Sequence, residues 1–131
     1  MTAEYQFTRV LADRFEATFL FYRDVMGFTP VFGTQHDTYA DFDLGTFHIS
    51  LFDRAEMAAA LGTSGLPVSA PAQDGVCLVF EVADVRAEAA RLTSLGVPLV
   101  ADVTDHPDWG ITTLHLRDPE GALLELNQPL P

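Results

Sequence analysis

The same succession of predicted elements occurs twice along this chain of 131 residues, and this repetition restricts the fold more than any single motif. A short β-prone segment, a helical segment, a glycine and three strand candidates occupy residues 7–52, and the same order returns in residues 76–128. The halves share few identical residues, so the repeat is one of pattern. A half of about 55 residues is marginal alone, whereas two together bury a sizeable core. We therefore expect one α+β domain, residues 1–131, built from two similar modules.

Module one is expected to occupy about residues 1–62. Phe15, Phe19, Tyr22 and Met26 recur at helical spacing, which places them on one face of a helix that Gly27 ends. An alanine-rich helix stopped by Gly62 completes the module. The expected elements are a strand at 7–12, a helix at 15–26, strands at 30–33, 39–44 and 46–52, and a helix at 53–61.

A linker and a second module follow. Residues 63–75, TSGLPVSAPAQDG, contain two prolines and two glycines and are the expected linker. In module two, residues 76–131, Asp84 caps a helix that presents Val85, Ala89 and Leu92 on one face. Pro107 and Gly110 predict a turn at 106–110. The expected elements are a strand at 76–82, a helix to residue 95, and strands at 97–103, 111–117 and 122–128.

Charge and composition narrow the classes of partner. The net charge is −12, with 19 acidic and 7 basic residues, so phosphate backbones are repelled and no nucleic-acid partner is expected. Most of this charge serves solubility, although it also favours cationic ligands. No apolar run approaches the roughly 18 residues of a membrane helix, and the N-terminus does not read as a signal peptide. The single cysteine excludes an intrachain disulfide and fits a reducing cytoplasm.

Three segments carry a resemblance to a known family. They are FEATFLFYRDVMGF at 15–28, VADVRAEAARLTSLGV at 82–97 and LRDPEGALLEL at 116–126. With these segments at these separations the chain resembles the vicinal oxygen chelate superfamily, which includes glyoxalase I, bleomycin resistance proteins and extradiol dioxygenases. The resemblance covers nearly the whole chain. It implies two βαβββ modules whose mixed sheet curls into a cup, and a homodimer with sites often near the subunit interface.

The resemblance also implies where a divalent metal would bind. In the family's metal enzymes, four side chains from the first and last strands of the two modules hold the ion. Those positions fall here on Phe7, near Ser50, on Cys77 and on Glu125. Phenylalanine has no donor atom, Gln6 would replace it only after a one-residue slip of the strand, and a thiolate is unusual beside hard ligands. Glu125 alone matches, so we expect no metal cofactor, with a divalent metal as the alternative.

Other side chains on the same strands are candidates to line the cup. If Phe7 faces the cup, alternation brings Arg9 and Leu11 to the same face. An arginine there needs a partner, which would be Glu125 or an anionic ligand, unless it lies in solvent at the rim. His48 shares a face with Ser50 and is interpreted as a polar lining residue.

Two residues near the end of the chain leave alternatives open. Trp109 beside Gly110 would either cover an apolar pocket or cap the core, which is the commoner use of tryptophan. His115 or Leu114 lies opposite Glu125, depending on the register of the hairpin. If it is His115, a His–Glu pair lines the cup and could move protons.

These observations favour a metal-free small-molecule binding protein that resembles bleomycin resistance proteins. An apolar cup with few polar groups suits a cationic or aromatic compound such as an antibiotic. The alternatives are a metal-dependent lyase, isomerase or dioxygenase with an altered ligand set centred on Glu125, and a metal-free enzyme that uses Glu125 as a base. The expected ligand-binding residues are Phe7, Arg9, His48, Ser50, Cys77, Trp109, His115 and Glu125.

Overall fold

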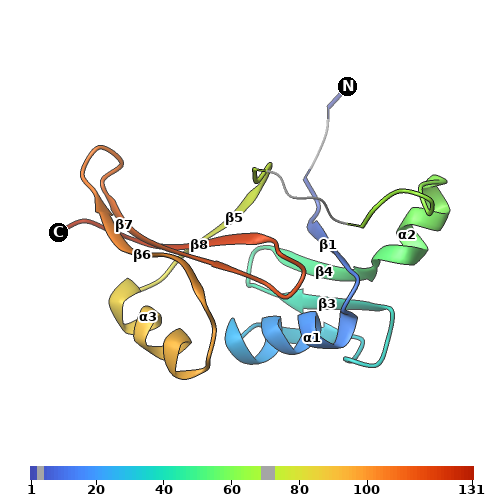
Figure 1. The fold of residues 1–131 in the computed structure, drawn as a ribbon, viewed down its shortest axis with the longest axis horizontal. Coiled ribbons are helices and arrows are strands. Elements are labelled where there is room, and N and C mark those ends of the chain that lie inside the picture. The colour runs from blue at the N-terminus through green and yellow to red at the C-terminus, as the bar shows by residue number, and fades with distance from the viewer. Residues whose placement is uncertain (3–4, 69–72) are drawn as a thin grey trace. The chain divides into compact units, whose positions relative to one another are not determined.

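The computed structural model describes residues 1–2, 5–68 and 73–131, and the chain divides into two compact units, Met1–Pro71 and Ala72–Pro131. Each unit contains a four-stranded mixed sheet with helices (Figure 1). The two units repeat one topology, which confirms the predicted α+β fold of two βαβββ modules. The boundary falls within the predicted linker at 63–75, of which residues 69–72 lie outside the described residues.

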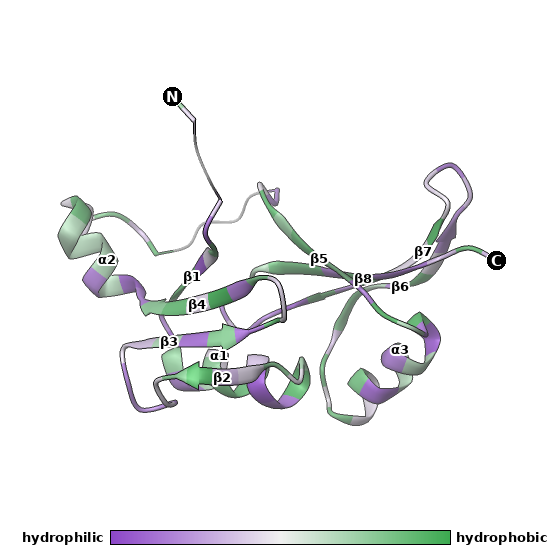
Figure 2. Cartoon of the chain, turned by 180° about the vertical axis from the view of Figure 1, so that it is seen from behind, coloured by the Kyte–Doolittle hydropathy of each residue, from purple (hydrophilic) through white to green (hydrophobic). Residues whose placement is uncertain are grey.

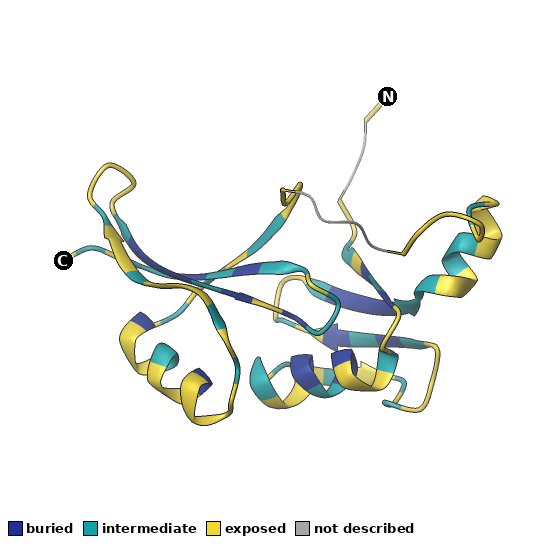
Figure 3. Ribbon diagram, in the orientation of Figure 1, coloured by how far each residue is buried: buried dark blue, intermediate teal, exposed yellow. Residues whose placement is uncertain are grey.

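The first unit has the strand order β1-β4-β3-β2, with β1 parallel to β4 and the other pairs antiparallel. The side of the sheet that faces α1 buries Ala40 and Phe42 of β3 and Ile49 and Leu51 of β4, and Figure 3 shows buried residues along both strands. The elements are β1 (Thr8–Ala12), α1 (Phe15–Leu20), η1 (Phe21–Val25), β2 (Thr29–Phe32), β3 (Tyr39–Asp43), β4 (His48–Asp53) and α2 (Arg54–Leu61).

The predicted helix at 15–26 forms, but its second half is a π-helical turn. The Met26 N–H donates to the Phe21 carbonyl at 3.0 Å, an i to i+5 bond that is wider than the α-helical one. Only two of the four residues that we expect on the apolar face are therefore buried. Phe19 and Tyr22 are buried, and Phe21 joins them because the wider turn changes the spacing. Gly27 ends the segment with a positive φ, as predicted.

The second unit repeats this arrangement with the order β5-β8-β7-β6, in which β5 is parallel to β8. Its helix α3 alternates hydrophilic and hydrophobic positions (Figure 2) and buries Val85 and Leu92. The elements are β5 (Cys77–Glu81), α3 (Val85–Ser94), β6 (Leu99–His106), β7 (Ile111–Arg117) and β8 (Leu123–Pro129).

The predicted turn at 106–110 is one residue too long. His106 ends β6 and pairs with Ile111 of β7, so the turn spans residues 107–110. The strand therefore runs to His106 rather than to residue 103, with two irregularities in its register that take up the extra length. No helix among the described residues is long and apolar enough to cross a membrane.

The predicted cap of α3 is present. The Asp84 side chain accepts a hydrogen bond from the Ala87 backbone N–H at 3.0 Å. We expect Asp84→Ala to lower the free energy of unfolding by about 1 kcal/mol, because this N–H loses its partner. Asp84→Asn keeps an acceptor oxygen, so its free energy of unfolding should stay close to that of the unchanged protein. Urea unfolding followed by circular dichroism measures both, and equal losses in the two variants would contradict the assignment.

Candidate functional site

The second sheet has one face against α3 and one distal to it. The core face carries buried leucines, namely Leu114, Leu116, Leu124 and Leu126. Strand alternation and the paired register put the intervening residues on the opposite face. We call this the second distal face, and its members on β5, β7 and β8 include Cys77, Val79, Thr113, His115, Leu123, Glu125 and Asn127.

Glu125 is held there by two side chains. The His115 Nε2 lies 2.9 Å from Oε1, and the Asn127 Nδ2 donates to Oε2 at 3.0 Å. The register of β7 on β8 sets His115 opposite Glu125, so of the two alternatives left open by the sequence it is His115 and not Leu114 that faces the carboxylate. The side chains of His115 and Glu125 are only 22% and 13% exposed. We call His115, Glu125 and Asn127 the Glu125 cluster.

The cluster has the geometry for proton exchange. A carboxylate only accepts hydrogen bonds, so the His115 Nε2 carries the hydrogen of the 2.9 Å contact. The Nδ1 of the neutral ring is then the acceptor atom of the pair, while Glu125 orients the ring. Asn127 was not predicted as a site residue, although alternation from Glu125 along β8 points to it.

An aromatic stack adjoins the cluster on the same sheet. The Trp109 ring lies on the His106 ring with centroids 4.1 Å apart and planes at 11°. The His106 Nε2 forms a 3.0 Å hydrogen bond with the hydroxyl of Thr113, which pairs across the ladder with Asn127. Trp109 is 62% exposed, so its interpretation as a cap on the core is wrong. The tight turn at 107–110 directs the ring onto His106 and out to solvent.

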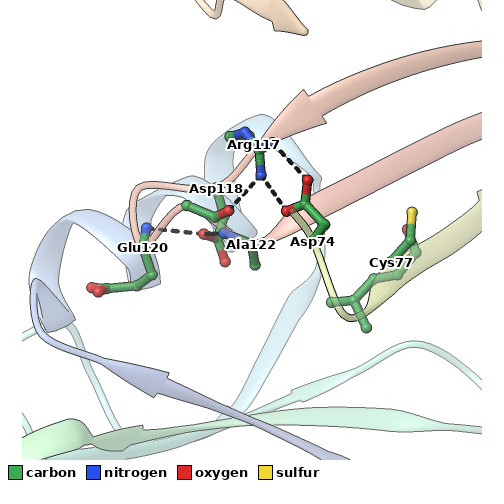
Figure 4. Close-up of polar contacts among 8 residues, drawn as sticks. Asp74, Cys77, Arg117, Asp118, Glu120 and Ala122 are labelled. Carbon is green, nitrogen blue, oxygen red and sulfur yellow. Dashed lines mark hydrogen bonds and ion pairs between the residues drawn. The ribbon is translucent and has the colours of Figure 1, made fainter. Parts of the chain in front are cut away.

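Cys77, at the start of β5, is half-buried. Burial raises the pKa of its thiol, and the carboxylates of Glu125 and Asp74 raise it further. Asp74 itself is ionised, because its hydrogen bonds to Arg117, at 2.7 and 2.9 Å, lower its pKa (Figure 4). The Cys77 thiol is therefore protonated at neutral pH, which makes it a poor nucleophile and a poor metal ligand.

The rate at which Cys77 is alkylated reports on this environment. At pH 8 we expect iodoacetamide to react slowly, because the raised pKa leaves little thiolate. Glu125→Gln removes one of the charges that raise the pKa, so the thiolate fraction and the rate should increase by about two- to threefold. Glu81→Gln, an exposed change on the same strand, is the control and should leave the rate unchanged. A rate that is equal in all three proteins would contradict the proximity of Glu125 and Cys77.

The turn between β7 and β8 positions Glu125. The Asp118 Oδ1 accepts hydrogen bonds from the backbone N–H groups of Glu120 and Ala122, at 2.9 and 2.8 Å (Figure 4). Asp118 is buried, and Gly121 adopts the left-handed conformation that the tight turn requires. This turn fixes where β8 begins opposite β7, and hence which residue faces Glu125.

The remaining predicted residues lie in the first unit. Phe7 stacks on His48, with ring centroids 4.9 Å apart. Arg9 is exposed, with its guanidinium carbon 5.4 to 6.0 Å from the rings of Phe7, Tyr39 and Phe52. Ser50 is completely buried, and its hydroxyl has no hydrogen-bond partner. The assignment of these residues to ligand binding stays a prediction.

The donor set at the family's metal positions does not suit a divalent ion. Phe7 has no donor atom, Ser50 offers only a neutral hydroxyl, and Cys77 is held in the protonated form. Glu125 is the one carboxylate of the set, and a single ligand falls short of the three protein ligands that catalytic divalent sites use. Among the described residues, no three His, Cys, Asp or Glu side chains form a group that could hold a metal ion.

A paired βαβββ fold with a polar cluster on the last strand defines a class of proteins that includes both enzymes and binding proteins. The family model described as the Glyoxalase/Bleomycin resistance protein/Dioxygenase superfamily matches residues 5–126. The chain belongs to this superfamily, which confirms the resemblance found in the sequence.

Known relatives share the fold over nearly their full length. The uncharacterized protein YraH of Bacillus subtilis (strain 168) is 30% identical over 122 residues, which cover 93% of this chain and 95% of that protein. The crystal structure of a lactoylglutathione lyase from Agrobacterium tumefaciens is similar with a TM-score of 0.72 and 26% identity, over 96% of this chain and 93% of that one. A glyoxalase/bleomycin resistance protein/dioxygenase family enzyme from Burkholderia phytofirmans PsJN has a TM-score of 0.80 at 18% identity, over 98% and 100% of the chains, and this likeness concerns the fold alone.

Proposed function

We propose that this chain is a small-molecule binding protein of the glyoxalase/bleomycin resistance type, which binds a cationic or aromatic compound without a metal. The observation that supports this proposal is the Glu125 cluster, which shares a sheet with the exposed stack of Trp109 on His106. A half-buried carboxylate binds a cation through a charge-assisted hydrogen bond. An exposed indole ring offers a flat surface on which a ligand ring stacks.

The charge of the whole chain supports the same ligand class. With a net charge of −12, the protein raises the local concentration of cations around it and speeds their association. Asn127 and His115 keep the Glu125 carboxylate oriented, so the entropic cost of ordering it when a ligand binds is small. The proposal includes the absence of a metal cofactor, since Glu125 alone of the family's metal positions matches.

Fluorescence of Trp109, the only tryptophan, tests the proposal. We would titrate the protein with 9-aminoacridine, a planar cation, and with acridine, its neutral analogue at pH 7.5, and confirm each affinity by calorimetry. The cation is expected to bind more tightly than acridine. Glu125→Gln should weaken the binding of the cation about tenfold, a loss of about 1.4 kcal/mol of binding free energy. The exposed change Glu16→Gln on α1 removes the same charge elsewhere and should have little effect. Failure of both compounds to bind, or an unchanged affinity in Glu125→Gln, would contradict the proposal.

A metal-free enzyme that transfers protons is the second candidate, and the 2.9 Å contact of His115 with Glu125 favours it. In this role the His115 Nδ1 would remove a proton from an acidic C–H group of the bound compound. Incubation of a bound compound in D₂O, followed by mass spectrometry, separates the candidates. Deuterium incorporation that is lost in His115→Gln while binding persists would establish catalysis, and an unlabelled ligand would leave the chain as a binding protein.

The resemblance further supports a homodimer, and the single cysteine supports a reducing cytoplasm. Sedimentation equilibrium is expected to give a mass twice that of the chain, and a mass equal to that of one chain would refute the dimer.

A further inference from the structure

Three polar side chains form a row across the first sheet, on the face distal to α1. The register pairs Arg9 of β1 with Ser50 of β4, and Ser50 with Asp41 of β3. Residues paired across strands project from the same face, and neighbouring strands lie about 4.8 Å apart, so the Cα atoms of Arg9 and Asp41 are about 10 Å apart. The row therefore has a cation at one end, a carboxylate at the other and a hydroxyl between them.

Two polar atoms of this row lack hydrogen-bond partners. Ser50 is fully buried with an unpartnered Oγ, and the Oδ1 of Asp41 is a buried atom that is also unpartnered. Nearly all buried polar atoms in proteins have a partner, and an unpaired one lowers stability. Two such atoms on adjacent strands and on one face are therefore an unusual feature that a bound molecule would explain.

Aromatic rings keep the Arg9 guanidinium in place. Its central carbon lies 5.4 Å from the ring centroid of Phe7, 5.6 Å from that of Phe52 and 6.0 Å from that of Tyr39. Contacts with ring faces leave the N–H groups of a guanidinium available to an anion, which they bind in pairs. The same rings offer apolar surface to the body of a ligand.

We propose that this row binds a zwitterionic compound with an aromatic or apolar body, whose carboxylate pairs with Arg9 and whose ammonium group pairs with Asp41. The serine hydroxyl, which lies between the two charges in the row, bonds the ligand. The inference rests on the proposed function in that it treats the chain as a binding protein. It adds a ligand chemistry for the polar row of the first unit.

Three forms of one amino acid test the two charges separately. L-tryptophan carries both charges, N-acetyl-L-tryptophan lacks the cation, and L-tryptophanamide lacks the anion. Titration of the ¹⁵N-labelled full chain, followed by NMR, should show saturable shifts at amides of β1, β3 and β4 with L-tryptophan. Loss of either ligand charge should weaken binding at least tenfold. Equal affinities for the three compounds, no binding of L-tryptophan, or shifts confined to the second unit would overturn the inference.

Variants assign each charge to its residue. Asp41→Asn should abolish the preference for L-tryptophan over N-acetyl-L-tryptophan. Arg9→Gln should abolish the preference for L-tryptophan over L-tryptophanamide. The exposed Asp13→Asn, outside the row, is the control and should keep both preferences. Glu125→Gln distinguishes the two proposals, since it should weaken 9-aminoacridine but leave L-tryptophan unaffected. Preferences retained in both row variants would refute the assignment, and the wild-type ligand series tests the row even if a variant unfolds.

Discussion

Replacing Leu124 with alanine is expected to lower the free energy of unfolding by about 3 kcal/mol, whereas Leu123→Ala should cost about 1 kcal/mol or less. Leu124 is fully buried on the α3 side of β8, and its truncation leaves a cavity between the sheet and the helix. Leu123 lies half-buried on the second distal face, where the loss of its side chain opens no cavity in the core.

These two leucines form a matched pair. They are adjacent on one strand and undergo the same truncation, so only the face of the sheet differs. Urea unfolding followed by far-ultraviolet circular dichroism gives both free energies, with the dependence on urea serving as a check on two-state behaviour. Similar losses in the two variants would mean that the second distal face is packed like the core, which would argue against its use for a ligand.

The Asp118→Ala variant is expected to lose about 2 to 3 kcal/mol of stability, the second of the large effects. Its carboxylate is buried and accepts two backbone N–H groups in the turn before β8, and alanine leaves both unpaired. Asp118→Asn retains an acceptor oxygen in nearly the same place and should lose clearly less.

Thermal unfolding compares the two Asp118 variants, and the NMR signals of the His115 ring report on the consequence for the site. Because the turn sets the register of β8 on β7, the alanine variant should broaden or shift those signals, while the asparagine variant should preserve them. Equal destabilisation by alanine and asparagine would show that the charge of Asp118, and not its two accepted hydrogen bonds, stabilises the turn.

The sequence predicts on which face of the sheet each residue of β8 lies, but not which residue of β7 lies opposite Glu125. In LLEL, alternation alone predicts that Leu124 and Leu126 face the core while Glu125 faces away. The choice between His115 and Leu114 depends on a single residue of register, which the length and hydrogen bonds of the Asp118 turn decide. A pattern of side chains does not contain that information.

The errors in the prediction have local causes. The helical period of Phe15 and Phe19 does not continue through the π turn, and no residue of FYRDV predicts that turn. Pro107 favours a turn that begins at His106, yet the pairing of His106 with Ile111 extends the strand. The sequence does not single out Asp41, because an acidic residue on an alternating strand normally faces solvent, and only the three-dimensional register places it beside Ser50.

The central claim, that the Glu125 cluster binds a cationic aromatic compound without a metal, is tested most directly by one calorimetric titration. The protein is dialysed against EDTA and titrated with 9-aminoacridine, and the titration is repeated after addition of zinc, nickel, manganese or iron(II). We expect one affinity throughout, within about twofold, and a loss of about tenfold in Glu125→Gln in every buffer. Binding that appears only after a metal is added, with one ion held per chain and lost in Glu125→Ala, would contradict the account and establish a metal enzyme.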